Sequence, residues 1–298
     1  MKKLILIPLL ILSIICEAQF THSGGTFLKT GSGFMTAQAS STPPEEYTDE
    51  YQDVYDAMTT KPTTYDDDQN TLVVDLKAAG VWAKADIIYV FAQEVNSAGE
   101  ALINWKNPGT FNATNTTSLS FTANEGFTGV SSTTEYMSTN YNPSTQATNF
   151  ALNSATLSVY SRSELSGMET VLGVFDGTSD LELMPNYSGV FNAPLNAGAA
   201  VSTATPATDG LITASRTSSS NTDFYTDGTY IDSDTGASNT IPNGVIYMFA
   251  HNVSGTASYP MDGQLSFIFI GSSLTSTQVT NMNTAVEKYM DAMGKGVE

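Results

Sequence analysis

The sequence predicts a mainly β (all-β) fold: a two-sheet antiparallel jelly-roll sandwich, flanked by N-terminal helices and a C-terminal helix. First, 41% of the residues are hydrophobic and only 14% are charged, which is enough apolar material for a large core. Second, short apolar runs separated by turn residues follow one another from Asp86 onward, without the helix–strand alternation of a parallel sheet. Third, Asp227-Gly228 lies between two alternating runs, which is the strongest short signal for a β-hairpin.

The N-terminus has the three parts of a signal peptide, predicted over residues 1–18 with cleavage after Ala18. Met1-Lys2-Lys3 is followed by an apolar run over 4–15 and then by Cys16-Glu17-Ala18. The apolar run is shorter than the roughly 20 residues of a membrane span. We therefore expect a secreted or cell-surface protein, with a virion as the alternative location, and membrane attachment only through an uncleaved leader.

Cys16 is the only cysteine, so the mature chain is expected to contain none. This excludes a disulfide framework, a cysteine nucleophile and a cysteine-ligated metal.

Residues 19–65 are expected to form an N-terminal linker that ends in a short acidic helix. Its first part is rich in Gly, Ser and Thr, whereas Pro44 suits the first position of a helix and Lys61-Pro62 its end. Helical spacing relates the apolar residues between them: Tyr47, Tyr51, Val54, Tyr55 and Met58.

The remaining residues, 66–298, are expected to form one sandwich domain. A helix is predicted from Asp66-Asp67-Asp68, whose acids suit a helix N-terminus, to Gly80. The C-terminal helix is predicted over 275–293, because Thr275 and Gln278 form a capping box and Gly294 closes the helix. One stripe is predicted to pack on the sandwich: Val279, Met282, Val286, Tyr289, Met290 and Met293.

The strands divide into two kinds by pattern. Three runs are apolar on both faces, which predicts strands covered on both sides: 87–91, 245–250 and 265–270. Others alternate, or are short and apolar between turn residues: 156–161, 171–175, 181–184 and 211–215.

The hairpin over 222–234 supplies the candidate binding site. Counting outward from Asp227-Gly228 pairs Tyr225 with Tyr230, Phe224 with Ile231, and Asp223 with Asp232. Phe224 and Ile231 would face the core, whereas Asp223, Tyr225, Tyr230 and Asp232 would share the outer face. Two outward tyrosines form a surface on which a sugar ring stacks, although an ordinary cross-strand aromatic pair explains them equally well.

The acids near the hairpin raise the question of a calcium ion. Calcium takes oxygen ligands from carboxylates, and the candidates are Asp232, Asp234 and Asp262. Exposed acids separated in water explain the same pattern, so no cofactor is assigned and calcium is kept as an alternative.

Catalytic and nucleic-acid functions have little support. The formal charge of −19 repels nucleic acid. Asp180-Leu181-Glu182 is the nearest carboxylate pair, expected on the solvent face of a strand without a third partner, and the chain has no Glu-x-Asp motif. His251 is expected to be structural, because nothing like a nucleophile elbow accompanies it, and His22 lies in the linker.

Four segments in order resemble concanavalin A-like sandwiches of the laminin-G-like kind. They are Gly126-Phe127-Thr128-Gly129, the run 151–161, Phe224-Tyr225-Thr226-Asp227-Gly228, and Met261-Asp262-Gly263-Gln264-Leu265 leading to Leu274-Thr275. Segments 75–91 and 99–109 also look like those that precede such sandwiches in phage virion or host-attachment proteins.

These resemblances imply an exported, non-catalytic protein that binds a glycan or another cell-surface or virion partner. A capsid, spike or surface-layer subunit that forms a homo-oligomer is the alternative, and a glycan hydrolase with atypical carboxylates is the second alternative.

Overall fold

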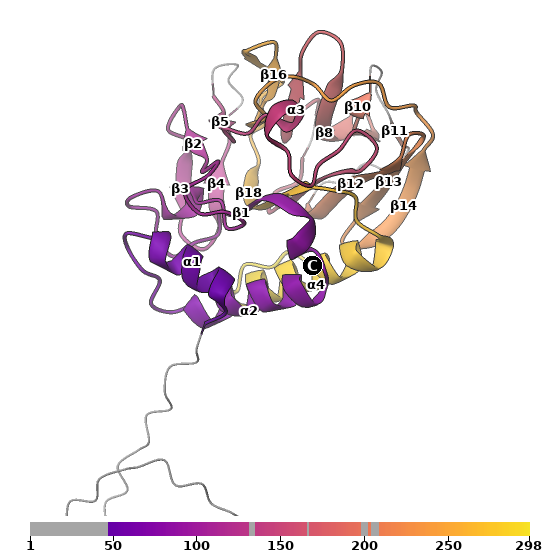
Figure 1. Cartoon of the computed structure of the whole chain (residues 1–298). Coiled ribbons are helices and arrows are strands. Elements are labelled where there is room, and N and C mark those ends of the chain that lie inside the picture. Colours follow the sequence, from indigo (N-terminus) through magenta and orange to yellow (C-terminus); the bar gives the residue numbers. More distant parts are fainter. Residues whose placement is uncertain (1–46, 131–134, 166, 198–201, 204–208) are drawn as a thin grey trace, which may run out of the picture. The chain divides into compact units, whose positions relative to one another are not determined.

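The computed structural model describes residues 47–130, 135–165, 167–197, 202–203 and 209–298. In this part of the chain two β-sheets pack face to face, and three helices cover one of them (Figure 1). The predicted mainly β, two-sheet sandwich with N-terminal helices and a C-terminal helix is confirmed. The predicted leader, residues 1–18, and Pro44 lie outside the described residues.

Sheet A is the helix-covered sheet. Its described strands, in spatial order, are β14 (Thr229–Asp234), β13 (Asn221–Thr226), β12 (Gly210–Ser218), β6 (Ala155–Ser161), β18 (Gln264–Gly271), β4 (Gly126–Thr128) and β3 (Ser120–Thr122), and β1 (Ala85–Val90) also pairs with β18.

Sheet B is the opposite sheet. Its described strands, in spatial order, are β11 (Ser202–Thr203), β9 (Val190–Asn192), β8 (Asp180–Tyr187), β7 (Leu172–Phe175), β15 (Tyr247–Met248), β5 (Met137–Ser138) and β2 (Thr114–Asn115). Strand β10 (Leu195–Ala197) pairs with β8, and the hairpin of β16 (His251–Val253) and β17 (Thr256–Ser258) joins β7 through a short parallel pairing.

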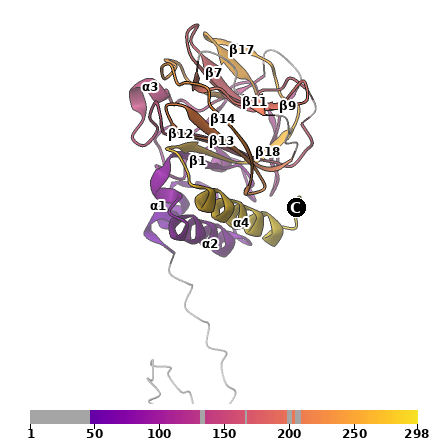
Figure 2. The same cartoon turned by 90° about the vertical axis from the view of Figure 1, so that its right-hand side faces the viewer.

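The helices lie together on the outer face of sheet A (Figure 2). Helix α1 (Asp49–Ala57) precedes α2 (Asp66–Ala78), and α4 (Ser276–Ala292) follows the last strand. The shorter helical segments are α3 (Pro143–Gln146), η1 (Trp82–Lys84) and η2 (Glu100–Leu102). Among the described residues, none of the helices combines the length and the apolar composition that crossing a membrane requires.

Alternation along the strands of sheet A divides the apolar residues between two cores. In β18, Ile268 and Ile270 face the core between the sheets, whereas Phe267 and Phe269 face the helices. Strand β1 divides in the same way, with Tyr89 toward sheet B and Ile88 toward the helices. The prediction that 87–91 and 265–270 are covered on both sides is therefore confirmed.

The third doubly apolar run, 245–250, differs from its prediction. Only Tyr247–Met248 forms a strand, because Phe249 has a φ of +64° that ends the extended conformation before β16 begins. Ile246, Met248 and Phe249 are nevertheless buried in the core between the sheets.

The predicted helices occur close to their expected positions. Thr275 caps α4 through a complete capping box with Gln278, and all six residues of the predicted stripe are buried. Helix α2 begins at Asp66, and Gly80 after it has a φ of +69°.

The acidic helix predicted inside a linker is instead part of the folded unit. Tyr51 and Val54 of α1 are fully buried, and Tyr51 donates a 2.8 Å hydrogen bond to Gln69 of α2. The compact unit extends from residue 45 to 298, so the predicted domain start at 66 is too late. The apolar stripe of α1 is packing surface, because it lies in the same core as α2 and α4.

Candidate functional site

The hairpin of β13 and β14 has the predicted turn but a different register beyond it. Asp227 and Gly228 both have positive φ, at +50° and +69°, and Tyr225 lies opposite Tyr230. The next pairs place Phe224 opposite Asp232 and Asp223 opposite Ser233. The predicted pairing of Asp223 with Asp232 is therefore wrong, because an extra residue in β14 forms a β-bulge.

The outer face of the hairpin is not a free surface, because α4 covers part of it. Phe224 points into the core between the sheets, as predicted, but Tyr225 packs in the helix-side core and is only 2% exposed. Burial, with a smaller contribution from Asp223, raises the pKa of Tyr225 to about 12. Tyr230 is 49% exposed, and the two rings meet edge to face at 5.8 Å. The predicted pair of outward tyrosines is thus reduced to one.

The hairpin turn itself packs on α4. The Thr280 hydroxyl donates a 2.7 Å hydrogen bond to the Gly228 carbonyl. A Cβ on Gly228 would come within 2.9 Å of the Asn283 Cβ, so the turn requires glycine for space as well as for φ. Docking on the helix is the physical reason for the loss of the predicted binding face.

The acids of the predicted site have local roles. The Asp223 carboxylate accepts a 2.9 Å hydrogen bond from the Asn221 amide, and Asp232 accepts one of 2.8 Å from the Ser233 backbone N–H. Asp234 accepts a hydrogen bond from the Gly236 N–H. Burial lowers the pKa of Arg216, and the charge of Asp234 opposes that effect.

The predicted calcium ligands do not come together. Asp262 lies beside Glu169, whose pKa is raised to about 7 by burial and by this neighbouring carboxylate. In the part of the chain that the structure describes, only one group of three potential ligand side chains is close enough to share a metal, and it contains none of Asp232, Asp234 and Asp262.

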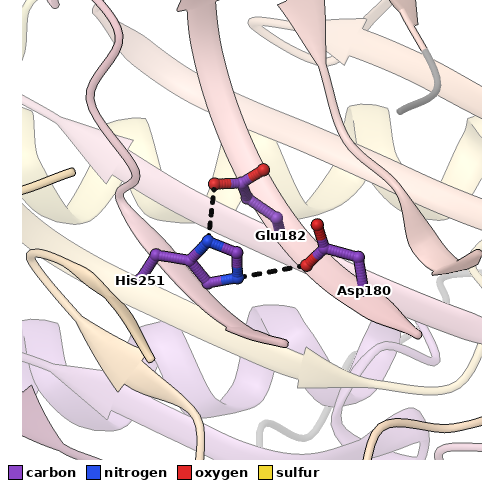
Figure 3. Close-up of side chains that lie close together, drawn as sticks. All are labelled: Asp180, Glu182 and His251. Atoms are coloured by element: carbon purple, nitrogen blue, oxygen red, sulfur yellow. Dashed lines mark ion pairs between the residues drawn. The ribbon is translucent and has the colours of Figure 1, made fainter. Parts of the chain in front are cut away.

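That group is Asp180, Glu182 and His251, here called the acid–histidine cluster (Figure 3). The two ring nitrogens of His251 face different carboxylates: Nε2 lies 3.1 Å from Asp180 Oδ1, and Nδ1 lies 3.2 Å from Glu182 Oε1. Glu182 and His251 are buried, whereas the Asp180 side chain keeps 22% of its surface exposed.

Alternation along β8 places both carboxylates on the outer face of sheet B. Leu181 and Leu183 enter the core between the sheets, so Asp180 and Glu182 point the other way. His251 reaches them from β16, past Gly173 of β7. A Cβ on Gly173 would come within 2.9 Å of the His251 Cδ2, so glycine at this position leaves room for the ring.

Electrostatics favour a charged imidazole in this cluster. Burial alone would lower the pKa of His251, but the facing carboxylates of Asp180 and Glu182 outweigh it and raise the pKa above the ordinary value of 6.5. Burial also raises the pKa of Glu182, against the opposing effect of His251. A protonated histidine between two acids is therefore the state that this geometry stabilises.

Hydrogen bonding in the cluster is incomplete. The Thr170 hydroxyl donates to Glu182 Oε1, and the Asn192 amide lies 3.5 Å from Oε2. Asp180 Oδ1 and His251 Nε2 are close enough to attract as charges, yet neither atom has a well-aligned hydrogen-bond partner among the described residues. Asn192 Oδ1 is likewise buried without a partner.

The arrangement is unsuited to the usual hydrolytic mechanisms. In a nucleophilic triad one histidine nitrogen faces a hydroxyl, whereas here both face carboxylates. A glycosidase pair must admit a sugar between its carboxyl groups, and here the imidazole of His251 fills that space. The expectation that Asp180 and Glu182 form the solvent face of a strand is wrong for Glu182, because His251 and its neighbours cover it.

A tyrosine lies next to the cluster on the surface. Tyr259 follows β17, its ring centroid is 6.4 Å from that of His251, and it is 49% exposed. Its φ of +49° is unusual for a bulky residue and coexists with a 3.0 Å hydrogen bond from the Thr170 N–H to its carbonyl. Farther along the same outer face, Tyr136 and Tyr247 stack at 4.1 Å.

Sequence reasoning identified Asp180 and Glu182 as a carboxylate pair and His251 separately, but did not bring the three together. The Asp-x-Glu spacing indicates a shared face, and that signal was available. The approach of β16 to β8 over Gly173 was not, because it depends on contacts of His251 with residues 69 and 71 positions earlier in the chain.

No protein-family model matches the chain, and no curated protein matches it. Solved structures that resemble it include the Ruminococcus gnavus IT-sialidase CBM40 bound to α2,6 sialyllactose, at 14% identity over 52% of this chain and 96% of that chain, with a TM-score of 0.37. The botulinum neurotoxin serotype D binding domain is 11% identical over 69% of this chain and 52% of that chain, with a TM-score of 0.48.

The K499G mutant of NanB sialidase from Streptococcus pneumoniae is 13% identical over 44% of this chain, with a TM-score of 0.37. The match covers only 24% of that sialidase chain. Likenesses at this level are too distant to carry a functional conclusion.

Proposed function

We propose that the protein is a non-catalytic glycan-binding protein whose ligand contacts the outer face of sheet B beside Tyr259. The observation that carries this proposal is an exposed tyrosine beside His251, the residue that also faces the partly exposed Asp180 carboxylate. Tyr259 offers a ring face and a hydroxyl, which is the combination that packs on a sugar and hydrogen-bonds to it. Asp180 supplies an acceptor for sugar hydroxyls.

The acid–histidine cluster acts in this proposal as a support. His251 attracts Asp180 from behind, and Glu182 neutralises the other side of the imidazole. A carboxylate held in this way loses little side-chain entropy when a ligand binds, which improves affinity. No step in the proposal needs proton transfer or a nucleophile.

A glycan array tests the proposal with matched variants. Tyr259→Ala and Tyr230→Ala remove two tyrosines of equal exposure, 49% each, from different places. We expect Tyr259→Ala and Asp180→Asn each to weaken binding to the best array ligand at least tenfold, and Tyr230→Ala to leave it within twofold. Unchanged binding in Tyr259→Ala and Asp180→Asn, or equal loss in Tyr230→Ala, would reject this site.

The biological setting proposed with this function is attachment to a cell surface, by an exported protein or as part of a phage virion. Export has its own test. Expression of the full chain followed by mass spectrometry of the secreted protein should give Gln19 as the first residue. A protein that remains inside the cell with Met1 intact would contradict the predicted leader.

A further inference from the structure

A pocket separate from the site beside Tyr259 lies where β1 begins. It has a volume of about 180 Å³, and its polar lining consists of Asp86, Lys106, Asn107, Gln146, Thr148 and Asn149. Pockets for drug-sized ligands start at roughly 300 Å³. This pocket is therefore the right size for a single small ring.

One wall of the pocket is fixed by Asp86, whose carboxylate is already fully used. It accepts hydrogen bonds from the Tyr141 hydroxyl at 2.9 Å and from the backbone N–H groups of Thr148, Asn149 and Phe150 at 3.1, 2.9 and 2.8 Å. Four donors saturate the carboxylate. Asp86 thus holds the 148–150 loop in place and has little capacity left to bind a ligand.

In contrast to Asp86, Lys106 is not saturated by partners among the described residues. Its ammonium lies 5.5 Å from the centre of the Trp82 ring, and no carboxylate of the described residues lies within ion-pairing distance of it. Burial lowers the pKa of Lys106, although Glu50 and Asp86 act in the other direction. Glu50 is itself paired with Lys77. A carboxylate that entered the pocket would give Lys106 a direct partner.

The remaining lining suits the rest of a sugar. The side-chain amides of Asn107, Gln146 and Asn149 carry both donors and acceptors, as sugar hydroxyls require. Gln146 Oε1 accepts one hydrogen bond from the Asn142 N–H and the Asn149 amide donates one to the Ala85 carbonyl, which leaves each of these amides further hydrogen-bonding capacity. Phe111 adds an apolar surface, and its φ of +56° coexists with a hydrogen bond of 2.6 Å from the Tyr89 hydroxyl to its carbonyl.

We propose that this pocket binds a small hydroxylated carboxylate of the acidic-monosaccharide class, with Lys106 pairing with the ligand carboxylate. The ring hydroxyls contact the amides, and the apolar face of the ring packs on Phe111. The proposal does not depend on the site beside Tyr259, because the two sites share no residue.

Calorimetric titration with D-glucuronate and D-glucose tests the proposal, since the two sugars differ only in the group at C6. We expect D-glucuronate to bind at least tenfold more tightly than D-glucose, and less tightly as salt is raised. Lys106→Met should reduce the preference to below twofold, whereas Lys106→Arg should keep most of it. Lys84→Met is the matched control and should retain the full preference.

Equal binding of the two sugars, binding of neither, or an unchanged preference in Lys106→Met would overturn the proposal. Melting temperatures of all variants show whether the fold is intact. If Lys106→Met lowers stability, Asn107→Ala provides the second test, with an expected loss of affinity for both sugars. Tyr259→Ala should leave D-glucuronate binding unchanged, so failure here and failure at the first site are distinguishable.

Discussion

The two sheets share one core, yet their outer faces have different surroundings. The outer face of sheet A lies under α1, α2 and α4, and hydroxyls on it pair with one another: those of Ser158 and Thr213 are 2.6 Å apart. The outer face of sheet B carries the acid–histidine cluster and an exposed tyrosine beside it. The helices thus bury polar and aromatic side chains on the outer face of sheet A. The outer face of sheet B keeps an exposed aromatic side chain and a partly exposed carboxylate.

The tyrosines of the hairpin provide the largest expected effect and the sharpest form of this comparison. Tyr225→Ala should lower the free energy of unfolding by about 3 to 5 kcal/mol, as other large buried aromatics do, because the ring fills space under α4. Tyr230→Ala, half exposed on the next strand, should cost less than about 0.5 kcal/mol. Urea denaturation of both variants checks the pair, and similar losses would mean that α4 does not cover the hairpin as described.

The acid–histidine cluster should also contribute strongly to stability. His251→Ala leaves two carboxylates without their cation and should cost about 3 kcal/mol, because breaking a buried ion pair leaves an uncompensated charge. Lys288→Ala removes an exposed pair with Asp75 and should cost about 0.5 kcal/mol. The two ion pairs differ in burial, so the comparison separates the effect of burial from that of ion pairing. A loss of stability in His251→Ala no larger than that in Lys288→Ala would contradict the role of the acid–histidine cluster.

Gly173 tests whether the ring of His251 needs the space beside it. Gly173→Ala should lower stability by about 2 kcal/mol, since the new Cβ would approach the His251 ring and the Leu181 carbonyl at 2.9 and 3.0 Å. If His251 causes most of the strain, the double variant with His251→Ala should lose less than the sum of the single losses. Additive losses in urea denaturation would show that the ring is not the obstacle.

Stability should fall as pH rises, and His251 and Glu169, whose pKa values are raised in the folded state, should contribute to the fall. His251 has a raised pKa in the folded state, so its contribution is complete below about 6.5 and is lost as pH rises through the folded value. Glu169, with a folded pKa of about 7, loses its contribution between about 4.5 and 7 by the same logic.

Melting temperatures measured from pH 5 to 9 should therefore decline in the wild-type protein. Glu169→Gln should flatten the lower part of the profile and His251→Gln the upper part. Tyr225→Phe, on the helix-covered face, should leave its shape unchanged. A profile that rises with pH would contradict both assignments.

The sequence was sufficient for the features that depend on near neighbours. The Asp227-Gly228 turn, the capping box of Thr275 and Gln278, and the doubly buried β1 and β18 all follow from local patterns. The strand register beyond Tyr230 did not follow from local patterns, because a one-residue β-bulge leaves no clear signal in the sequence. The exposure of Tyr225 was wrong for a different reason: alternation tells which residues share a face, but not which helix lies on it.

Strand order adds a consequence for biosynthesis. β18 lies in the middle of sheet A and pairs with β1, β4 and β6, all made more than 100 residues earlier. Until residue 271 has left the ribosome, these earlier strands have no central partner, and folding must wait for contacts of very long sequence separation. The nascent chain therefore remains incompletely folded through most of its synthesis.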